Sequence, residues 1–181
     1  PQLRSGDRLT DAFFACSPLN SRTLTLMELL QDRDRSKLDS SDDALFYEMP
    51  RFVTHVDESF IDRLTQLYRD RLQPDSHILD LMSSWVSHLP DEVNFARVEG
   101  HGMNEAELAK NPQLSGYIVQ NLNHDPKLPY ADAEFDAVLN AVSVQYLQHP
   151  ETVFAEILHG NSSAYFLLQS GYTYLHNRNS T

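Results

Sequence analysis

The chain has 181 residues, 41% of them hydrophobic, and carries 26 acidic against 14 basic side chains, giving a formal net charge of -12. This length allows one domain with a sizeable core, and the hydrophobic content excludes wholesale disorder. The acidic surface repels phosphate backbones and no basic patch offsets it, so we expect no nucleic-acid partner. No apolar run approaches the ~20 residues that a bilayer requires, so no membrane association is expected.

Cysteine and histidine usage gives no sign of a disulfide framework or a metal site. Cys16 is the one cysteine in the chain, so no internal disulfide can form. The eight histidines show neither a His-x3-His pair nor an HExxH sequence, and we therefore expect no metal. The chain begins at Pro1 rather than at methionine, which indicates processing or a fragment.

Residues 1–45 are expected to form a partly flexible, partly helical N-terminal extension to a domain that covers residues 46–181. Within the extension, residues 24–30 can form a short helix. Residues 31–43 are charged and rich in Ser and Asp, which is typical of a linker. Pro50 then disfavours a continuous helix. The apolar side chains around it are expected to pack on the main domain: Tyr47, Phe52 and Val53.

The remaining elements alternate between apolar strands and amphipathic helices. The strands are expected at residues 77–82, 95–99, 117–120, 135–139 and 164–169. The helices are expected at residues 57–72, 105–110 and 150–159, with Asp57 opening the first and Asn104 capping the second. This order predicts an α/β fold with a Rossmann-like, doubly wound, mostly parallel sheet in which each strand is followed by a crossover.

Two turns draw attention because of the residues they contain. The first strand should end in a tight turn at Ser83 and Ser84, followed by a helix or helical turn from Trp85 to Leu89. The second strand should enter a turn at residues 100–103. There, Gly102 is expected either where a side chain would block backbone or ligand, or where φ is positive.

Polar residues recur where the predicted strands end. They are Asp80, Ser83, Gly102, Asn121, Asn123, Asn140 and Ser143. The carboxyl ends of parallel strands meet at one edge of a sheet, and this edge is where open α/β sheets bind ligands. The pattern predicts a small-ligand site of nucleotide type. Asp80 itself has two interpretations, an anchor of the ligand loop or a cap of the following turn.

Five motifs follow one another in the chain: a Val-Leu-Asp-Leu-like strand, a Val-x-Gly-x-x-Met-Asn turn, a Leu-Pro-Tyr loop, a Phe-Asp-Ala-Val strand and a Pro-Glu-x-Val-Phe-x-Glu helix. Their order resembles that of class I S-adenosylmethionine-dependent methyltransferases. More narrowly, four strings resemble a methyltransferase-like family of cyanobacteria and plants: PRFVTHVD, LDLMSSWVSHLP, GHGMNEAEL and NAVSVQYL. The resemblance covers about residues 46–158. The resemblance implies methyl transfer to an unknown small-molecule or protein acceptor, with S-adenosylmethionine as cofactor. It also implies a location in the cytoplasm, or in the plastid of a plant.

The resemblance also implies which residues hold the cofactor. Residues 80–84 approach its methionine part, Gly102 and Met103 its ribose and adenine, Asn121 and Leu122 its adenine, and residues 140–143 the sulfonium and the acceptor. The implied set is Asp80, Met82, Ser83, Ser84, Gly102, Met103, Asn121, Leu122, Asn140 and Ser143. No catalytic residue is assigned, because methyl transfer from a sulfonium needs positioning more than acid–base help.

The sequence departs from the superfamily pattern in ways that leave an alternative open. Met82, Ser83 and Ser84 replace the glycine-rich loop, Gly102 replaces the ribose-binding acid, and Asn121 replaces the adenine-binding carboxylate unless Asp125 takes that role. The alternative is a non-catalytic binding module that has lost its cofactor motifs. The chain has room for about five of seven strands, so we expect a C-terminally incomplete fold whose exposed sheet edge can bind a partner or a second copy.

Overall fold

The computed structural model describes residues 13–14, 49–54, 56–160 and 165–169. The helix predicted at residues 24–30 and the linker predicted at residues 31–43 lie outside the described residues. The division of the chain between an extension and a domain therefore remains a prediction.

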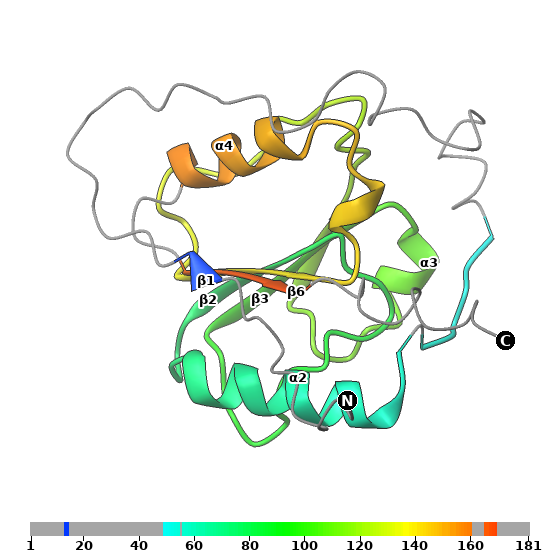
Figure 1. Cartoon of the computed structure of the whole chain (residues 1–181), viewed down its shortest axis with the longest axis vertical. Helices are drawn as coiled ribbons and strands as arrows, with labels where there is room; N and C mark the ends of the chain where they lie inside the picture. The colour runs from blue at the N-terminus through cyan, green and yellow to red at the C-terminus, as the bar shows by residue number, and fades with distance from the viewer. Residues whose placement is uncertain (1–12, 15–48, 55, 161–164, 170–181) are drawn as a thin grey trace, which may run out of the picture.

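A six-stranded sheet forms the centre of the described part of the chain (Figure 1). Its strands are β1 (Phe13–Phe14), β2 (His77–Leu81), β3 (Arg97–Gly102), β4 (Gly116–Val119), β5 (Ala137–Ala141) and β6 (Tyr165–Gln169). Their order across the sheet is β1-β6-β5-β2-β3-β4. The strands β2 to β6 pair in parallel, and β1 pairs antiparallel with β6. The expectation of an α/β fold with a mostly parallel sheet is confirmed.

Helices cover both faces of the sheet. They are α2 (Glu58–Arg71), α3 (Glu105–Leu108) and α4 (Pro150–Gly160), with a 3-10 turn, η2, at Val144–Tyr146. Figure 1 shows α4 on one face of the sheet, α2 on the opposite face, and α3 beside the carboxyl ends of the strands. The doubly wound arrangement follows from this placement, because connections must pass on both faces.

Each face of the sheet has its own hydrophobic core, because side chains alternate along a strand. On the α4 face, Leu79, Leu81 and Val138 pack with residues of α4 and of the loops. On the α2 face, Ile78, Leu139 and Val98 pack against Leu64, Tyr68 and Leu72 of α2 and its end. Ile78 and Leu79 are both fully buried, which stabilises the fold by roughly 1.5–3 kcal/mol for each side chain.

Both predicted helix caps are confirmed. The Asp57 side chain accepts a hydrogen bond from the Phe60 N–H at 2.8 Å and so begins α2. The Asn104 side chain accepts from the Glu107 N–H at 3.0 Å and so begins α3. These bonds satisfy amide groups that a helix start leaves without an intrahelical partner.

The helix predicted between Trp85 and Leu89 is wrong. The chain follows an irregular path from Met82 to Ala96. Serine hydroxyls compete with helical backbone bonds, and here the Ser84 carbonyl accepts from the Asn111 side chain at 3.0 Å rather than from a following amide. No helix was predicted between β4 and β5, and the chain there is irregular, with Pro126 and Pro129 interrupting it.

The turn predicted at residues 100–103 is wrong for its first three residues, which continue β3. Neither Gly100 nor Gly102 has a positive φ. Both glycines serve close approach instead, since an added Cβ would lie 2.4 Å from Leu114 Cδ1 at Gly100 and 2.6 Å from the Ser83 carbonyl oxygen at Gly102. The expectation of a positive φ at Gly102 is thus wrong. The other expectation, that a side chain at this position would block the backbone, is confirmed.

Candidate functional site

The carboxyl ends of β2, β3, β4 and β5 bring the ten predicted cofactor residues to one edge of the sheet. Figure 1 shows this edge on the side of the molecule where α3 lies. The pairing register places Asp80 beside Gly100 and Leu139, and Leu81 beside His101. The predicted residues therefore lie at or next to neighbouring positions at the ends of four adjacent strands.

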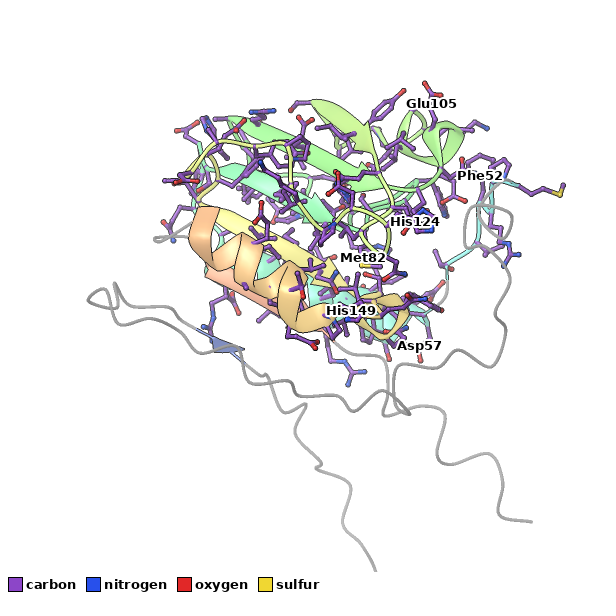
Figure 2. The ribbon with its side chains drawn as sticks, turned by 90° about the horizontal axis from the view of Figure 1, so that it is seen from above. Phe52, Asp57, Met82, Glu105, His124 and His149 are labelled. Carbon is purple, nitrogen blue, oxygen red and sulfur yellow. The ribbon has the colours of Figure 1, made fainter. Side chains whose placement is uncertain are left out.

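The turn after β2 takes a left-handed path through Met82, which has φ 57° and is labelled in Figure 2. The Ser83 N–H then donates to the His101 carbonyl at 2.7 Å, which ties the turn to β3. Glycine is the residue that usually adopts this backbone conformation. Met82 adopts it without being glycine, so the turn follows a tight path although the glycine-rich loop is absent.

Asp80 anchors the loop that follows this turn. One oxygen of its carboxyl group accepts hydrogen bonds from the Ser83 and Ser87 hydroxyls, each at 2.6 Å. The Asn111 side chain donates to the Ser87 hydroxyl at 2.8 Å and extends the network. Burial raises the pKa of Asp80 to about 6, while the two hydroxyl bonds act in the opposite direction. The charge of Asp80 contributes to raising the pKa of Tyr68, which burial raises more.

The opposite face of the sheet carries two buried polar side chains, His101 and Asn140, in the row of Leu81. His101 is 1% exposed and Asn140 is fully buried. The Asn140 amide donates to the Leu81 carbonyl across 3.4 Å, and its oxygen has no hydrogen-bond partner among the described residues. Neither ring nitrogen of His101 makes a hydrogen bond of ordinary geometry there, although the Gln120 side chain lies close. Burial lowers the pKa of His101 to about 4, which keeps the imidazole neutral.

The loops after β4 and β5 are joined by Asn123. Its amide donates to the Tyr146 carbonyl at 3.0 Å, and its oxygen accepts from the Gln148 N–H at 2.8 Å. Within these loops, the amide nitrogen of Asn121 and the hydroxyl of Ser143 are buried without a hydrogen-bond partner among the described residues. Unpaired buried polar atoms are rare in native proteins, and each one calls for an explanation.

The predicted site residues thus divide into two groups. Asn121, Asn140 and Ser143 retain unpaired polar atoms, whereas Asp80, Ser83 and Ser84 bond to other side chains. Leu122 is buried in the core on the α4 face, Met82 packs against that core, and Met103 follows β3 partly buried. Gly102 receives the backbone of the turn.

His101 is the residue that sequence reasoning missed. The motif Gly-His-Gly was interpreted as a turn, and His101 was not considered as a site residue. The available signal was the alternation along β3, which places His101 on the same face as Glu99 and beside Leu81.

The unpaired atoms define the chemistry that this edge offers. They comprise amide donors and acceptors, a hydroxyl and a neutral imidazole, all uncharged. Such a set suits a ligand with uncharged hydrogen-bonding groups, such as ring nitrogens, amino groups and sugar hydroxyls. In the described part of the chain, no group of three or more His, Cys, Asp or Glu side chains is placed to hold a metal ion. None of the helices there combines the length and apolar character of a membrane span.

Residues 86–159 match a family model described as a methyltransferase domain. The match begins in the loop after β2 and extends into α4, so it covers the ends of β3, β4 and β5 but not that of β2. It supports the class I S-adenosylmethionine-dependent methyltransferase superfamily, and it supports S-adenosylmethionine as the cofactor. No curated protein is similar enough in sequence to count as a match.

One solved structure supports the same fold, and two others are similar over about half of the chain. The PH0226 protein from Pyrococcus horikoshii has 21% identity and a TM-score of 0.50, over 67% of this chain and 65% of that one. The [4+2]-cyclase SpnF has 23% identity and a TM-score of 0.45, over 54% of this chain and 40% of the cyclase. A methyltransferase from Mesorhizobium loti has 18% identity and a TM-score of 0.42, over 52% and 47%. This chain spans 40% to 65% of the length of these structures.

Proposed function

We propose that the chain is a class I methyltransferase-like protein that binds S-adenosylmethionine at the carboxyl ends of β2 to β5 and transfers its methyl group to an acceptor. The observation that carries the proposal is the set of buried, unpaired polar atoms at the ends of β3, β4 and β5, on His101, Asn121, Asn140 and Ser143. The methyltransferase match over residues 86–159 supports the same function.

The residues present fit the uncharged parts of this cofactor. Asn121 and His101 would supply hydrogen-bonding groups for adenine and ribose, and Asn140 and Ser143 would supply them for the part of the cofactor that carries the methyl group. Met82 gives the turn after β2 its left-handed path, with Ser83 and Ser84 held in place beside it. Gly102, which precedes Met103, lies against the backbone of this turn, and Leu122 belongs to the core against which Met82 packs. Asp80 contributes through the loop that it anchors.

The chemistry demanded of these side chains is modest. The bound cofactor supplies a methyl group on a positively charged sulfur, which is already a good leaving group. The chain must hold the acceptor in line with that methyl group and exclude water, and fixed, uncharged hydrogen-bonding groups can do this. The acceptor is a small molecule or a protein. The narrower relationship to a family of cyanobacteria and plants, with a cytoplasmic or plastid location, is part of this proposal.

Thermal unfolding with S-adenosylmethionine and S-adenosylhomocysteine tests the function. Ligand at a hundred times its dissociation constant should stabilise the fold by about 2.7 kcal/mol. For a chain of this size we expect an increase in Tm of roughly 5–10 °C. The same measurement on Asn140→Leu, which removes one of the unpaired groups, should show a much smaller increase. A cooperative transition that neither compound shifts would contradict the proposal.

A second function, a non-catalytic binding module, is favoured by one observation. The Oδ2 atom of Asp80 already accepts hydrogen bonds from the Ser83 and Ser87 hydroxyls. In this part of the expected cofactor loop, that carboxyl oxygen therefore bonds to the protein and not to a ligand. In the described residues, β4 forms one edge of the sheet, with Val119 48% exposed at its end, and an edge strand can pair with another chain. This function predicts no ligand shift and a complex or dimer that substitution of Val119 by Lys weakens.

A further inference from the structure

Residues 49–54, which we call the strap, lie against the loop after β2 and against α3. Figure 2 labels Phe52 on the strap and Glu105 on α3, on the same side of the molecule. The Trp85 indole N–H donates to the Val53 carbonyl at 3.3 Å, and the rings of Phe52 and Trp85 meet edge to face at 6.3 Å. Lys110, just after α3, places its ammonium 4.2 Å from the centre of the Phe52 ring. The strap is therefore docked, although its residues are exposed.

Glu107 on α3 joins the strap to the turn after β2. One of its carboxyl oxygens accepts from the Arg51 N–H at 2.7 Å, and the other accepts from the Ser84 hydroxyl at 2.5 Å. The residue is 9% exposed, so these bonds form largely out of water. Hydrogen bonds to a carboxylate are among the strongest in proteins, and a buried one left without donors is costly. Glu107 therefore holds both partners in place at once.

The turn that Glu107 holds belongs to the candidate site. Ser84 follows Ser83, whose N–H donates to the carbonyl of His101, and His101 carries two of the unpaired nitrogens. A ligand at the strand ends would thus lie beside the same turn that Glu107 ties to the strap. Any change in that turn that favours the ligand must, through Ser84 and Glu107, affect the docking of the strap.

We propose that Glu107 is a positioning residue that couples docking of the strap to cofactor binding. The inference rests on the proposed function, because it needs a ligand at the strand ends. Coupling between two binding events is reciprocal: the factor by which the docked strap tightens ligand binding equals the factor by which ligand tightens strap docking. The strap thereby becomes part of the cofactor site without contacting the cofactor.

The chain offers a direct probe, because Trp85 is its only tryptophan and contacts the strap. Quenching of Trp85 fluorescence by acrylamide reports how well the strap covers the indole. In the full chain, saturating S-adenosylhomocysteine should reduce the quenching constant. Calorimetry on the same sample gives the dissociation constant of this compound.

Two pairs of variants separate coupling from simple loss of structure. Glu107→Gln should increase Trp85 quenching and weaken S-adenosylhomocysteine binding about tenfold, within the usual range of coupling. Glu105→Gln, on the exposed side of the same helix, should change neither. Arg51→Pro removes the strap N–H and leaves α3 untouched, whereas Arg51→Ala keeps that N–H. We expect Arg51→Pro to resemble Glu107→Gln and Arg51→Ala to bind the ligand several-fold more tightly than Arg51→Pro.

A double-variant cycle with Ser84→Ala completes the test. If the coupling passes through Glu107, Ser84→Ala already breaks it, and adding Arg51→Pro should weaken binding no further. Additive losses, or equal binding by the wild type, Glu107→Gln and Arg51→Pro, would overturn the inference and leave the proposed function standing. No binding of S-adenosylhomocysteine to the folded wild type would overturn both.

Discussion

The two faces of the sheet treat their buried polar groups in opposite ways at the strand ends. On the α2 face, the carboxyl group of Asp80 accepts from two hydroxyls, and Asn111 donates to Ser87 and to the backbone of Ser84. On the α4 face, His101 and Asn140 are more deeply buried, yet three of their four polar side-chain atoms are unpaired among the described residues.

We interpret this difference as one between polar groups that hold the loop after β2 and polar groups that are available to a ligand. A buried polar group left without a partner costs about 1–3 kcal/mol, which a folded chain can recover only when something else supplies the bond. On the α2 face, the buried polar groups bond to one another, and this network holds the irregular loop after β2 in place. The α4 face retains unused hydrogen-bonding capacity, so we expect substitutions there to affect ligand binding more than stability.

The largest effect should come from removing the centre of the paired network. Asp80→Ala leaves the Ser83 and Ser87 hydroxyls without their acceptor and should lower the free energy of unfolding by about 4 kcal/mol. Asp80→Asn keeps an acceptor oxygen and avoids burying a charge, so it should lose less than about 1 kcal/mol. Urea unfolding at pH 7 measures both, and equal losses would contradict the role given to the network.

The two faces should also respond to pH with opposite signs. The folded pKa of Asp80 is raised from 3.8 to about 6, so the pH-dependent part of its contribution to the free energy of unfolding is fully present below pH 4 and is lost as the pH rises through 6. The folded pKa of His101 is lowered from 6.5 to about 4, so its contribution is present above pH 6.5 and is lost as the pH falls through 4. Each of these two pH-dependent contributions to the free energy of unfolding amounts to about 3 kcal/mol.

In the wild type these two contributions largely cancel between pH 4 and pH 6. Asp80→Asn removes the contribution of the aspartate and leaves that of His101, so the free energy of unfolding should rise with pH across this window. His101→Gln removes the contribution of the histidine and leaves that of Asp80, so the free energy of unfolding should fall with pH. Urea midpoints at half-unit pH steps give the slopes, and parallel slopes in the two variants would refute the assignment of the pKa shifts.

A matched pair of buried asparagines tests the comparison at a single residue type. Asn111→Leu breaks two donated bonds on the paired face and should lose about 2–3 kcal/mol. Asn140→Leu removes one long bond and one unpaired oxygen, so its stability should change by less than about 1 kcal/mol. Its affinity for S-adenosylhomocysteine, by calorimetry, should fall at least tenfold. If Asn140→Leu were the more destabilising, the unpaired face would be structural after all.

The smallest effect concerns the backbone where β5 ends. Val142 has φ 60°, which is strained for a β-branched residue. Val142→Gly should relieve this strain and raise the free energy of unfolding by about 0.5–1 kcal/mol, since glycine adopts a positive φ freely. Val144→Gly, two residues on in η2, provides the control and should lower it. Tm measurements suffice, and a loss at both positions would show that Val142 is held by packing.

Local patterns predicted much of this fold. The strands at β2, β5 and β6 were recognisable as short apolar runs, and Asp57 and Asn104 signalled the starts of α2 and α3 by their own hydrogen-bonding capacity. The loop from Met82 to Pro90 was mispredicted for the opposite reason. Its path depends on Asn111 and Glu107, which lie more than twenty residues away, and short-range spacing carries no record of such partners.

The candidate site was predicted in part for a similar reason. Asn121, Asn140 and Ser143 are polar residues after apolar runs, so their position at the strand ends was visible in the sequence. Whether a polar atom there is paired depends on the facing strand and helix, and this is why Asp80 and Asn140 could not be distinguished beforehand. His101 was missed because the two neighbouring glycines favoured a turn, until close packing against Leu114 and Ser83 explained them.

His101 has a backbone and a side chain with separate duties. Its carbonyl oxygen holds the Ser83 N–H and so keeps the turn after β2 in place, whatever side chain the residue carries. Its side chain lies on the α4 face, where neither ring nitrogen has a hydrogen-bond partner of ordinary geometry among the described residues. Under the proposed function, substitution of the His101 side chain would therefore change the hydrogen-bonding groups offered to a ligand, while the backbone bond that holds the turn would remain.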